Sequence, residues 1–351
     1  MKFGEDLVPR VESALRHILA DVPFVRSVRT RRPRAAQSGS ADLSVTLVLP
    51  DGQVTLQVAV KSKGEPRLAR DAVNLLARYR DLVPGSYGVF AAPYVSSASA
   101  RLCSDDGIGY LDLAGNCRLA FGTVLITREG KANPFGERRT LRSLFSPRAE
   151  RVLRVLLDFP GRRWKTQTLA GEAGVSLGQV SNVRRLLADR EWVRTEPAGL
   201  VLDDPSGLLT EWARNYRTER NVVRAFYAMK SVPEMEQQLG ALCQEQGLQY
   251  ALTGFSAAAR WAPVVTYSRV SAYVSGDIEG VVRGLGLKEV PTGANLSLLR
   301  PYDEGVFHGQ RSVDGVRLVS PVQAYLDLSC VKGRGEEAAS ALLEKEIRPR
   351  W

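Results

Sequence analysis

The chain has 351 residues, enough for two or three domains, because single hydrophobic cores stop growing near ~250–300 residues. Its hydrophobic share of 44% and charged share of 25% exclude a disordered or fibrous protein. No apolar run approaches the ~20 residues that cross a bilayer. Acidic residues interrupt the apolar positions of residues 1–22, as in an amphipathic helix and unlike a signal peptide. We therefore expect a cytoplasmic protein with no membrane partner.

Residues that commonly bind metals are sparse in this chain. Four scattered cysteines form no C-x-x-C pair, so neither a disulfide framework nor a structural zinc site is expected. The two histidines, His17 and His308, lie far apart in the sequence, which argues against histidine-based catalysis. The composition therefore predicts no cofactor.

The net charge is +10 and the isoelectric point is near 9.6, which favours a polyanionic partner, nucleic acid above all. The positive charge is concentrated in one segment. Residues 138–195 hold 13 arginines and lysines against five acids, a local excess of +8. This segment is the first place to look for a nucleic-acid interface.

The first predicted domain, residues 1–136, has the pattern of an α/β sandwich. After the opening helix and a turn-rich stretch at 26–40, two alternating segments flank the hairpin signal Asp51-Gly52. The remaining predicted elements are helices at 67–79 and 96–106 and strands at 41–50, 53–61, 87–93, 108–113 and 117–127. Asp112, Gly115 and Asn116 have turn chemistry, and the Gly-, Pro- and charge-rich residues 128–139 are typical of a linker.

This domain resembles the PD-(D/E)xK restriction-endonuclease-like fold over roughly 100 residues. In that family an aspartate and an acid-x-lysine motif hold Mg²⁺ and orient water. Asp42 fits the aspartate and Lys61 the lysine, but the acid position is Ala59, and Gln57 on the same strand face offers only a neutral amide. Glu12 on the first helix is a further candidate ligand. The resemblance therefore implies a catalytically degenerate domain, with Asp42, Gln57 and Lys61 as its degenerate candidates.

An arginine run follows the opening helix. Arg29, Arg31, Arg32 and Arg34 form, together with Arg26, a run without an acid among its members. We consider this run a possible DNA-contacting arm; the alternative is a solvated loop.

The second predicted domain, residues 137–205, has the pattern of a central winged helix-turn-helix. Apolar periodicity predicts helices at 147–158, 166–174 and 177–190, and an alternating segment at 191–205 turns at Pro197-Ala198-Gly199. Pro147 occupies the tolerated first helical position, and Ser176 with Gln179 forms a capping-box pattern before the third helix. We place Leu177, Val180 and Leu187 on the inward stripe of that helix, with either Val183 or Arg184.

Residue types that read base edges or bind phosphates cluster in this domain. The predicted DNA-binding residues are Arg162, Arg163, Lys165, Thr166, Ser176, Gln179, Ser181, Asn182, Arg184, Arg185 and Arg194. A solvated basic face with no ligand is the alternative. The chemistry favours double-stranded DNA as the partner.

The third predicted domain, residues 206–351, has an α+β pattern. Predicted helices span 207–229, 232–246, 321–328 and 335–347, and strand-like segments span 250–259, 269–275, 296–301 and 315–320. The segment resembles the carboxy-terminal domain of AbiE-type (type IV) antitoxins and related nucleotidyltransferase-like proteins. The matching features are Thr253-Gly254-Phe255-Ser256-Ala257-Ala258, Ser320-Pro321 with Gln323, Asp327-Leu328 and Gly333-Arg334-Gly335.

That resemblance implies a promoter-binding regulator, with a cognate toxin protein as a possible partner. Nucleotidyl transfer requires paired aspartates for Mg²⁺, and the strands after Gly254 offer only Asp277. We therefore expect a non-enzymatic, homodimeric DNA-binding transcriptional regulator on a two-fold site. The alternatives are a Mg²⁺-dependent DNA nuclease that uses Asp42, Gln57 and Lys61, and a toxin-sequestering protein-binding module.

Overall fold

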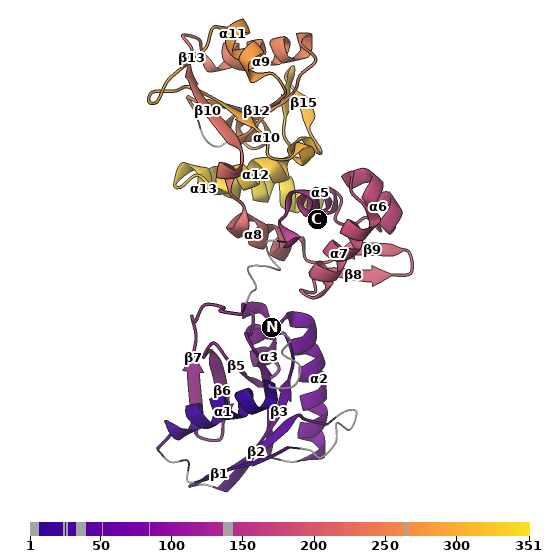
Figure 1. The fold of residues 1–351 in the computed structure, drawn as a ribbon, viewed down its shortest axis with the longest axis vertical. Coiled ribbons are helices and arrows are strands. Elements are labelled where there is room, and N and C mark those ends of the chain that lie inside the picture. Colours follow the sequence, from indigo (N-terminus) through magenta and orange to yellow (C-terminus); the bar gives the residue numbers. More distant parts are fainter. Residues whose placement is uncertain are drawn as a thin grey trace. The chain divides into compact units, whose positions relative to one another are not determined.

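The computed structural model describes residues 7–23, 25, 27–32, 40–50, 52–83, 85–135, 143–263 and 266–351 (Figure 1). The chain divides into two compact units. The first consists of Met1–Thr140 and Ala188–Glu191, and the second of Leu141–Leu187 and Trp192–Trp351. Within the described ranges, no helix has both the length and the apolar character needed to cross a membrane.

A seven-stranded mixed sheet forms the centre of the first unit, with the strands in sequence order. The two parallel pairs are β3–β4 and β4–β5, and the other neighbours are antiparallel. The strands are β1 (Ser27–Arg31), β2 (Leu43–Leu49), β3 (Gly52–Val60), β4 (Ser86–Ala92), β5 (Gly109–Asp112), β6 (Cys117–Phe121) and β7 (Val124–Arg128). Each parallel connection contains one helix, as parallel pairing requires.

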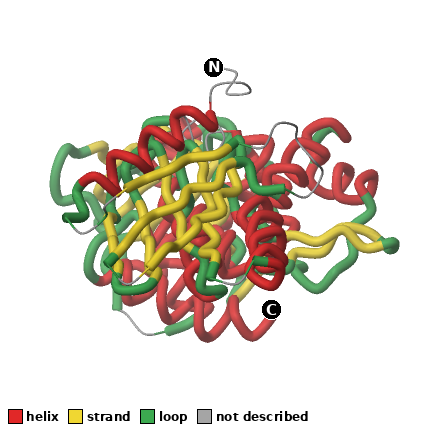
Figure 2. Tube along the Cα trace, turned by 90° about the horizontal axis from the view of Figure 1, so that it is seen from below, coloured by secondary structure: helices red, strands yellow, loops and turns green. Residues whose placement is uncertain are grey.

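Helices cover both faces of this sheet. The helix α1 (Leu7–Ala20) packs its apolar stripe on one face, as Figure 2 shows, and shares a core with alternate residues of β2. The helices α2 (Pro66–Leu82) and α3 (Ser97–Asp105) cover the other face. The predicted α/β sandwich elements are therefore present in the described residues.

Two segments of the first unit differ from the sequence predictions. Residues 117–127, predicted as one strand, form the hairpin β6–β7, because Gly122 adopts a φ of +53° and turns the chain. Residues 27–31, expected in a turn-rich stretch, form the edge strand β1. The predicted turn after β5 is confirmed: the Asp112 carboxylate accepts the backbone N–H of Asn116 at 2.8 Å, and Gly115 has a φ of +99°.

The second unit begins with three helices and a two-stranded hairpin, which we call the helix–hairpin segment (Pro147–Leu202). Its elements are α5 (Pro147–Asp158), α6 (Thr166–Ala173), α7 (Leu177–Ala188), β8 (Val193–Glu196) and β9 (Gly199–Leu202). The predicted helices and hairpin are confirmed at nearly the predicted bounds. The hairpin projects away from the helices in Figures 1 and 2.

A second seven-stranded mixed sheet follows, in the order β13-β10-β14-β12-β11-β16-β15. Its strands are β10 (Val222–Tyr227), β11 (Gln249–Leu252), β12 (Val270–Ser275), β13 (Lys288–Glu289), β14 (Leu296–Arg300), β15 (Arg311–Val313) and β16 (Val316–Leu318). The helices are α8 (Pro205–Asn215), α9 (Val232–Glu245), α10 (Gly254–Trp261), α11 (Ile278–Leu285), α12 (Pro321–Ser329) and α13 (Arg334–Leu342). The structure thus confirms a multidomain chain of mixed α/β character.

Two elements predicted for this part have the predicted secondary structure only in their first half. The helix predicted at 207–229 ends at Asn215, and Val222–Tyr227 forms β10, since β-branched and aromatic side chains favour a strand. The strand-like segment 250–259 ends at Leu252, and the helix α10 begins at Gly254. Gly254 has a φ of +56°, which permits the abrupt change from strand to helix.

Candidate nucleic-acid interface

Local sequence signals explain the bounds of the helix–hairpin segment. Pro147 begins α5 at a position where its missing N–H costs no hydrogen bond. Gly174 ends α6 in the left-handed region with a φ of +61°. Ser176 accepts the backbone N–H of Gln179 at 3.2 Å, so it caps the N-terminus of α7. These signals set the sharp turn between α6 and α7.

The helix α7 has one buried and one solvent-facing side. Val180, Val183 and Leu187 are buried. The sequence left either Val183 or Arg184 on the inward stripe, and the structure places Val183 there. Leu177, placed on the inward stripe by periodicity, is 54% exposed, so that assignment is wrong. Leu177 is the first residue of the helix, where the chain has not yet turned toward the core.

Two predicted base-reading side chains of α7 contact each other. The Arg185 guanidinium donates to the Asn182 side-chain oxygen at 3.0 Å. Asn182 is half-buried, and its amide nitrogen lies 3.5 Å from the Ser143 hydroxyl. Ser181, Arg184 and Arg185 are exposed. The pair therefore presents an oriented amide and guanidinium on the outer face of α7, the two groups best suited to adenine and guanine edges.

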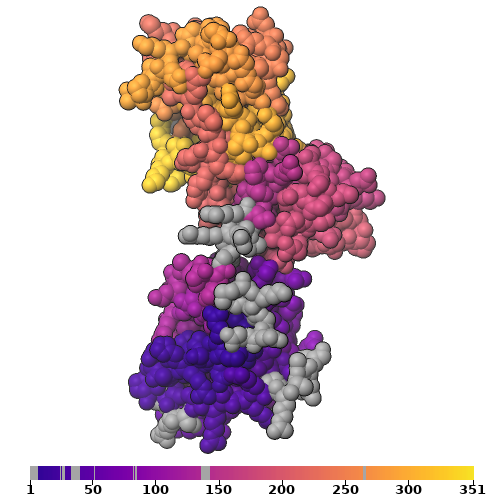
Figure 3. Space-filling model, in the orientation of Figure 1, coloured from indigo at the N-terminus to yellow at the C-terminus, as the bar shows by residue number. Residues whose placement is uncertain are grey.

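The remaining predicted DNA-binding residues lie on the same segment, which forms a continuous surface in Figure 3. Five of them are exposed: Arg162, Arg163, Lys165, Ser176 and Arg194. Thr166 and Gln179 are half-buried. Lys165 and Thr166 stand at the N-terminus of α6, where backbone N–H groups also suit a phosphate.

Acids on or next to the hairpin hold two of the predicted phosphate-binding arginines. Arg163 and Arg194 both donate to Glu196, at 2.7 and 2.9 Å, and Arg194 also donates to Asp203 at 2.6 Å. The hydrogen bonds from Arg163 and Arg194 lower the pKa of Glu196. Any phosphate contact by these arginines must therefore share or displace an existing ion pair, which reduces its net gain.

Trp164 joins the helices to the hairpin. Its backbone exchanges two hydrogen bonds with Leu200, at 2.8 and 2.9 Å, and the Arg162 guanidinium lies 4.0 Å from the centre of its ring. A Cβ at Gly199 would lie 2.6 Å from the Trp164 carbonyl oxygen, so this close approach requires glycine. The contact fixes the base of the hairpin beside Arg162 and Arg163.

Part of the basic charge counted in the sequence does not face solvent. Arg154 is 1% exposed and donates to the side-chain oxygen of Gln323 at 2.6 and 3.2 Å. Arg151 makes a bidentate ion pair with Asp303, at 2.8 and 3.0 Å. These two arginines connect α5 to the carboxy-terminal part, and Arg154 is too deeply buried to contribute to a DNA-facing patch.

In the first unit, the degenerate nuclease candidates engage protein groups. The Asp42 carboxylate accepts the backbone N–H of Val60 at 2.7 Å, and the Gln57 side-chain oxygen accepts the Ser44 hydroxyl at 2.7 Å. Ala59 is fully buried, so the acid position of the motif is a methyl group packed under α2. Among the described residues, no group of three or more His, Cys, Asp or Glu side chains is placed to hold a metal ion.

The described arginines of the run are exposed. Arg29 and Arg31 lie on the edge strand β1, and Arg32, although its side chain is 51% exposed, donates two hydrogen bonds to Glu12, one of them at 3.0 Å. A hydrogen bond from Thr30, followed by those from Arg32 and Arg16, lowers the pKa of Glu12. Arg34 and Arg26 lie outside the described residues.

A buried polar cluster surrounds Asp327 in the carboxy-terminal part. Its carboxylate accepts hydrogen bonds from Tyr216 and Tyr273, both at 2.9 Å, and from the Gln323 amide at 3.0 Å. The Thr253 hydroxyl donates to the other carboxylate oxygen. Burial raises the pKa of Asp327, and the four donors oppose that shift.

The structure thus brings together three of the positions on which the antitoxin resemblance rests: Thr253, Gln323 and Asp327. Sequence reasoning missed Tyr216, Tyr273 and Arg154, because no periodicity or spacing connects positions so far apart. Asp277, the only acid expected on the strands after Gly254, lies at the start of α11 with its side chain 61% exposed. It therefore provides no paired-carboxylate site.

Comparisons with solved structures give three related results. The chain is 19% identical to EndoMS in its apo form, with a TM-score of 0.21 over 29% of this chain and 45% of that one. It is 18% identical to EndoMS in a dsDNA2 complex, with a TM-score of 0.20 over 29% of this chain and 44% of that one. It is 16% identical to a repair endonuclease from Pyrococcus abyssi, with a TM-score of 0.21 over 29% of this chain and 46% of that one. The match thus spans less than half the length of each of these proteins.

Comparison with curated proteins found no match. The carboxy-terminal part of the chain does match a family, and the match confirms the resemblance to AbiE-type antitoxins over that part. Residues 201–348 match the family described as "Transcriptional regulator, AbiEi antitoxin, Type IV TA system".

Proposed function

We propose that the protein is a transcriptional regulator that reads double-stranded DNA through the helix–hairpin segment, acting as a winged helix-turn-helix. The observation that carries the proposal is the outer face of α7, where the exposed Arg185 donates to the side-chain oxygen of Asn182. A base-reading helix needs polar side chains that are exposed and already oriented. The regulatory family matched by residues 201–348 supports the same function.

The flanking groups have a separate task in this proposal. Arg162, Lys165 and Thr166 would contact phosphates, and Arg163 before α6 and Arg194 on β8 would follow the backbone beside α7. Phosphate contacts fix the register of a protein on the duplex but carry no sequence information. We further propose a homodimer, because a two-fold protein matches a two-fold site with half-sites ~34–36 Å apart.

The test begins with duplexes selected by the wild-type protein from fragmented genomic DNA. Affinity for a selected duplex and for a scrambled duplex is then measured by fluorescence anisotropy. The change Asn182→Ala with Arg185→Ala should weaken specific binding by about 1–3 kcal/mol for each lost base contact, with little effect on the scrambled duplex. Arg163→Ala should weaken both duplexes alike and flatten the salt dependence.

Arg283→Ala is the matched control, since Arg283 is 73% exposed on α11 of the same unit. This variant should bind both duplexes as the wild type does. Unchanged specific binding by the Asn182/Arg185 double variant would exclude α7 as the base-reading helix.

Neutralisation of a toxin is a second candidate function. The description of the family matched by residues 201–348 includes a type IV toxin–antitoxin system, and this match is the observation that favours it. In that case a cognate toxin would bind the carboxy-terminal part, and DNA binding would be a separate property of the helix–hairpin segment.

A further inference from the structure

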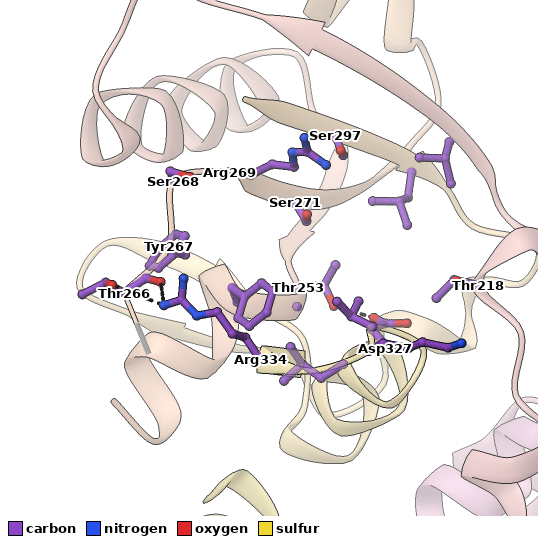
Figure 4. Close-up of a pocket in the computed structure, with 17 residues that line it drawn as sticks. Thr218, Thr253, Thr266, Tyr267, Ser268, Arg269, Ser271, Ser297, Asp327 and Arg334 are labelled. Carbon is purple, nitrogen blue, oxygen red and sulfur yellow. Dashed lines mark hydrogen bonds between the residues drawn. The ribbon is translucent and has the colours of Figure 1, made fainter. Parts of the chain in front are cut away.

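The carboxy-terminal part of the second unit contains a cavity of about 550 Å³ next to Asp327 (Figure 4). This volume lies in the range of ~300–1,000 Å³ that is typical of small-molecule sites. Apolar side chains line part of it: Val223, Phe255, Leu299, Leu328 and Val331. Hydroxyl groups line much of the rest: Thr218, Thr253, Thr266, Tyr267, Ser268, Ser271 and Ser297.

The charged groups on the cavity wall are mainly cationic. Arg269, Lys332 and Arg334 line it, and Figure 4 shows Arg269 and Arg334 on different sides of the opening. Arg334 donates to the Thr266 carbonyl oxygen at 2.7 Å, and Arg269 donates to the Ala294 carbonyl oxygen at 3.0 Å. These bonds hold both guanidinium groups in place and leave further N–H groups for a ligand.

Asp327, the acid on the cavity wall, does not neutralise these positive charges. Asp327 is 6% exposed and already accepts hydrogen bonds from four side chains, those of Tyr216, Tyr273, Gln323 and Thr253. Burial also raises its pKa, which disfavours its charged form. The accessible charge in the cavity is therefore positive.

The N-terminus of α10 opens onto the same cavity. Gly254 and Phe255, its first residues, line the wall. The preceding residue Thr253 makes no side-chain cap to the helix, because its hydroxyl donates to Asp327. Helix N-terminal N–H groups carry a partial positive charge and suit an anion. Two guanidinium groups and an uncapped helix end thus face one cavity.

We propose that this cavity is an effector site for a small organic phosphate. The phosphate would lie at the N-terminus of α10, within reach of Arg269 and Arg334, and its organic part would contact Phe255, Leu299 and Val331. The site is distinct from the helix–hairpin segment, so its occupancy can be measured without DNA.

The test uses the four ribonucleoside monophosphates as probes, because each joins a phosphate to a ring of suitable size. Isothermal titration calorimetry on the full chain should show one bound molecule per chain for at least one of them. The corresponding nucleoside and inorganic phosphate should each bind at least about tenfold more weakly, since each lacks half of the contacts. Arg269→Ala with Arg334→Ala should also weaken binding at least about tenfold.

Arg283→Ala, an exposed arginine away from the cavity, should leave binding unchanged, and the thermal unfolding of each variant verifies its fold. If the double variant unfolds early, Arg269→Gln alone provides the same comparison. Three results would overturn the proposal: no binding of any monophosphate at millimolar concentration, equal binding by a folded cavity variant, or equally tight binding of inorganic phosphate alone.

Discussion

At the scale of single residues, one buried acid with a raised pKa lies beside one of the two histidines. Burial raises the pKa of Asp158, the last residue of α5, to about 7, although Arg311, Arg154 and Arg350 draw it down. The His308 Nε2 lies 3.3 Å from its carboxylate, and burial lowers the pKa of His308. A Cβ at the next residue, Gly309, would lie 2.4 Å from the same carboxylate oxygen, so glycine allows this contact. Burial therefore favours the neutral form of both groups.

This arrangement predicts a pH-dependent effect of Asp158→Asn. The folded state holds the Asp158 proton more tightly than the unfolded state, so the free energy of unfolding falls as pH rises from about 4 to about 7. One pKa unit corresponds to about 1.4 kcal/mol, so the variant should gain up to about 4 kcal/mol over the wild type at pH 8. The gain should approach zero at pH 4.

Urea unfolding followed by tryptophan fluorescence measures this gain, because the five tryptophans of the chain all lie in the second unit. A gain that did not change between pH 4 and pH 8 would contradict the raised pKa of Asp158.

At the scale of elements, α5 belongs to two structures at once. Its apolar positions form the core of the helix–hairpin segment, while its polar ones contact the carboxy-terminal part. Glu150 is fully buried and accepts hydrogen bonds from Arg220 at 2.8 Å and from the Tyr302 hydroxyl. Arg154 reaches Gln323 on α12, which in turn donates to Asp327. A chain of buried hydrogen bonds therefore runs from α5 to the cavity wall.

This chain predicts strong coupling between two residues of different elements. Gln323→Leu should lower the free energy of unfolding of the second unit by about 2–3 kcal/mol, because it removes the hydrogen-bond acceptor of a buried guanidinium. Arg154→Met combined with Gln323→Leu should cost less than the sum of the single changes, by about 1–3 kcal/mol.

A double-mutant cycle in urea measures both quantities. Gln244→Leu on the exposed face of α9 is the matched control and should change stability by less than about 0.5 kcal/mol. If the two single changes were additive, Arg154 and Gln323 would contribute to stability independently, and the predicted coupling would be wrong.

At the scale of the whole molecule, the first unit raises the alternative of a nuclease. Its candidates do not form a metal site, because Gln57 is a neutral amide bonded to Ser44 and Ala59 fills the acid position. A hard cation such as Mg²⁺ requires several oxygen ligands, among them carboxylates. This arrangement favours a binding role for the first unit.

Supercoiled plasmid incubated with the protein and Mg²⁺ or Mn²⁺ should therefore remain intact on an agarose gel. The variant Asp42→Ala, purified identically, controls for contaminating nucleases. Cleavage by the wild type that the Asp42→Ala preparation lacks would overturn the non-catalytic assignment.

The secondary structure of the helix–hairpin segment could be predicted largely from its sequence. Proline and glycine positions, a serine cap and 3.6-residue periodicity are local signals, so the bounds of α5, α6 and α7 could be predicted closely. Local signals failed where tertiary pairing competes with helix propensity, as at Val222–Tyr227, which pairs with β13 and β14. The exposure of Leu177 escaped prediction for a similar reason, because periodicity does not say where the core ends.

Which charges face solvent and which are internal depends on long-range packing. Arg154 and Arg162 belong to the same basic stretch of sequence, yet one is buried against Gln323 and the other is exposed beside Trp164. The cluster around Asp327 joins residues that lie up to 111 positions apart. Residue type fixes the chemistry that each side chain offers, but burial and long-range contacts fix which partner it meets.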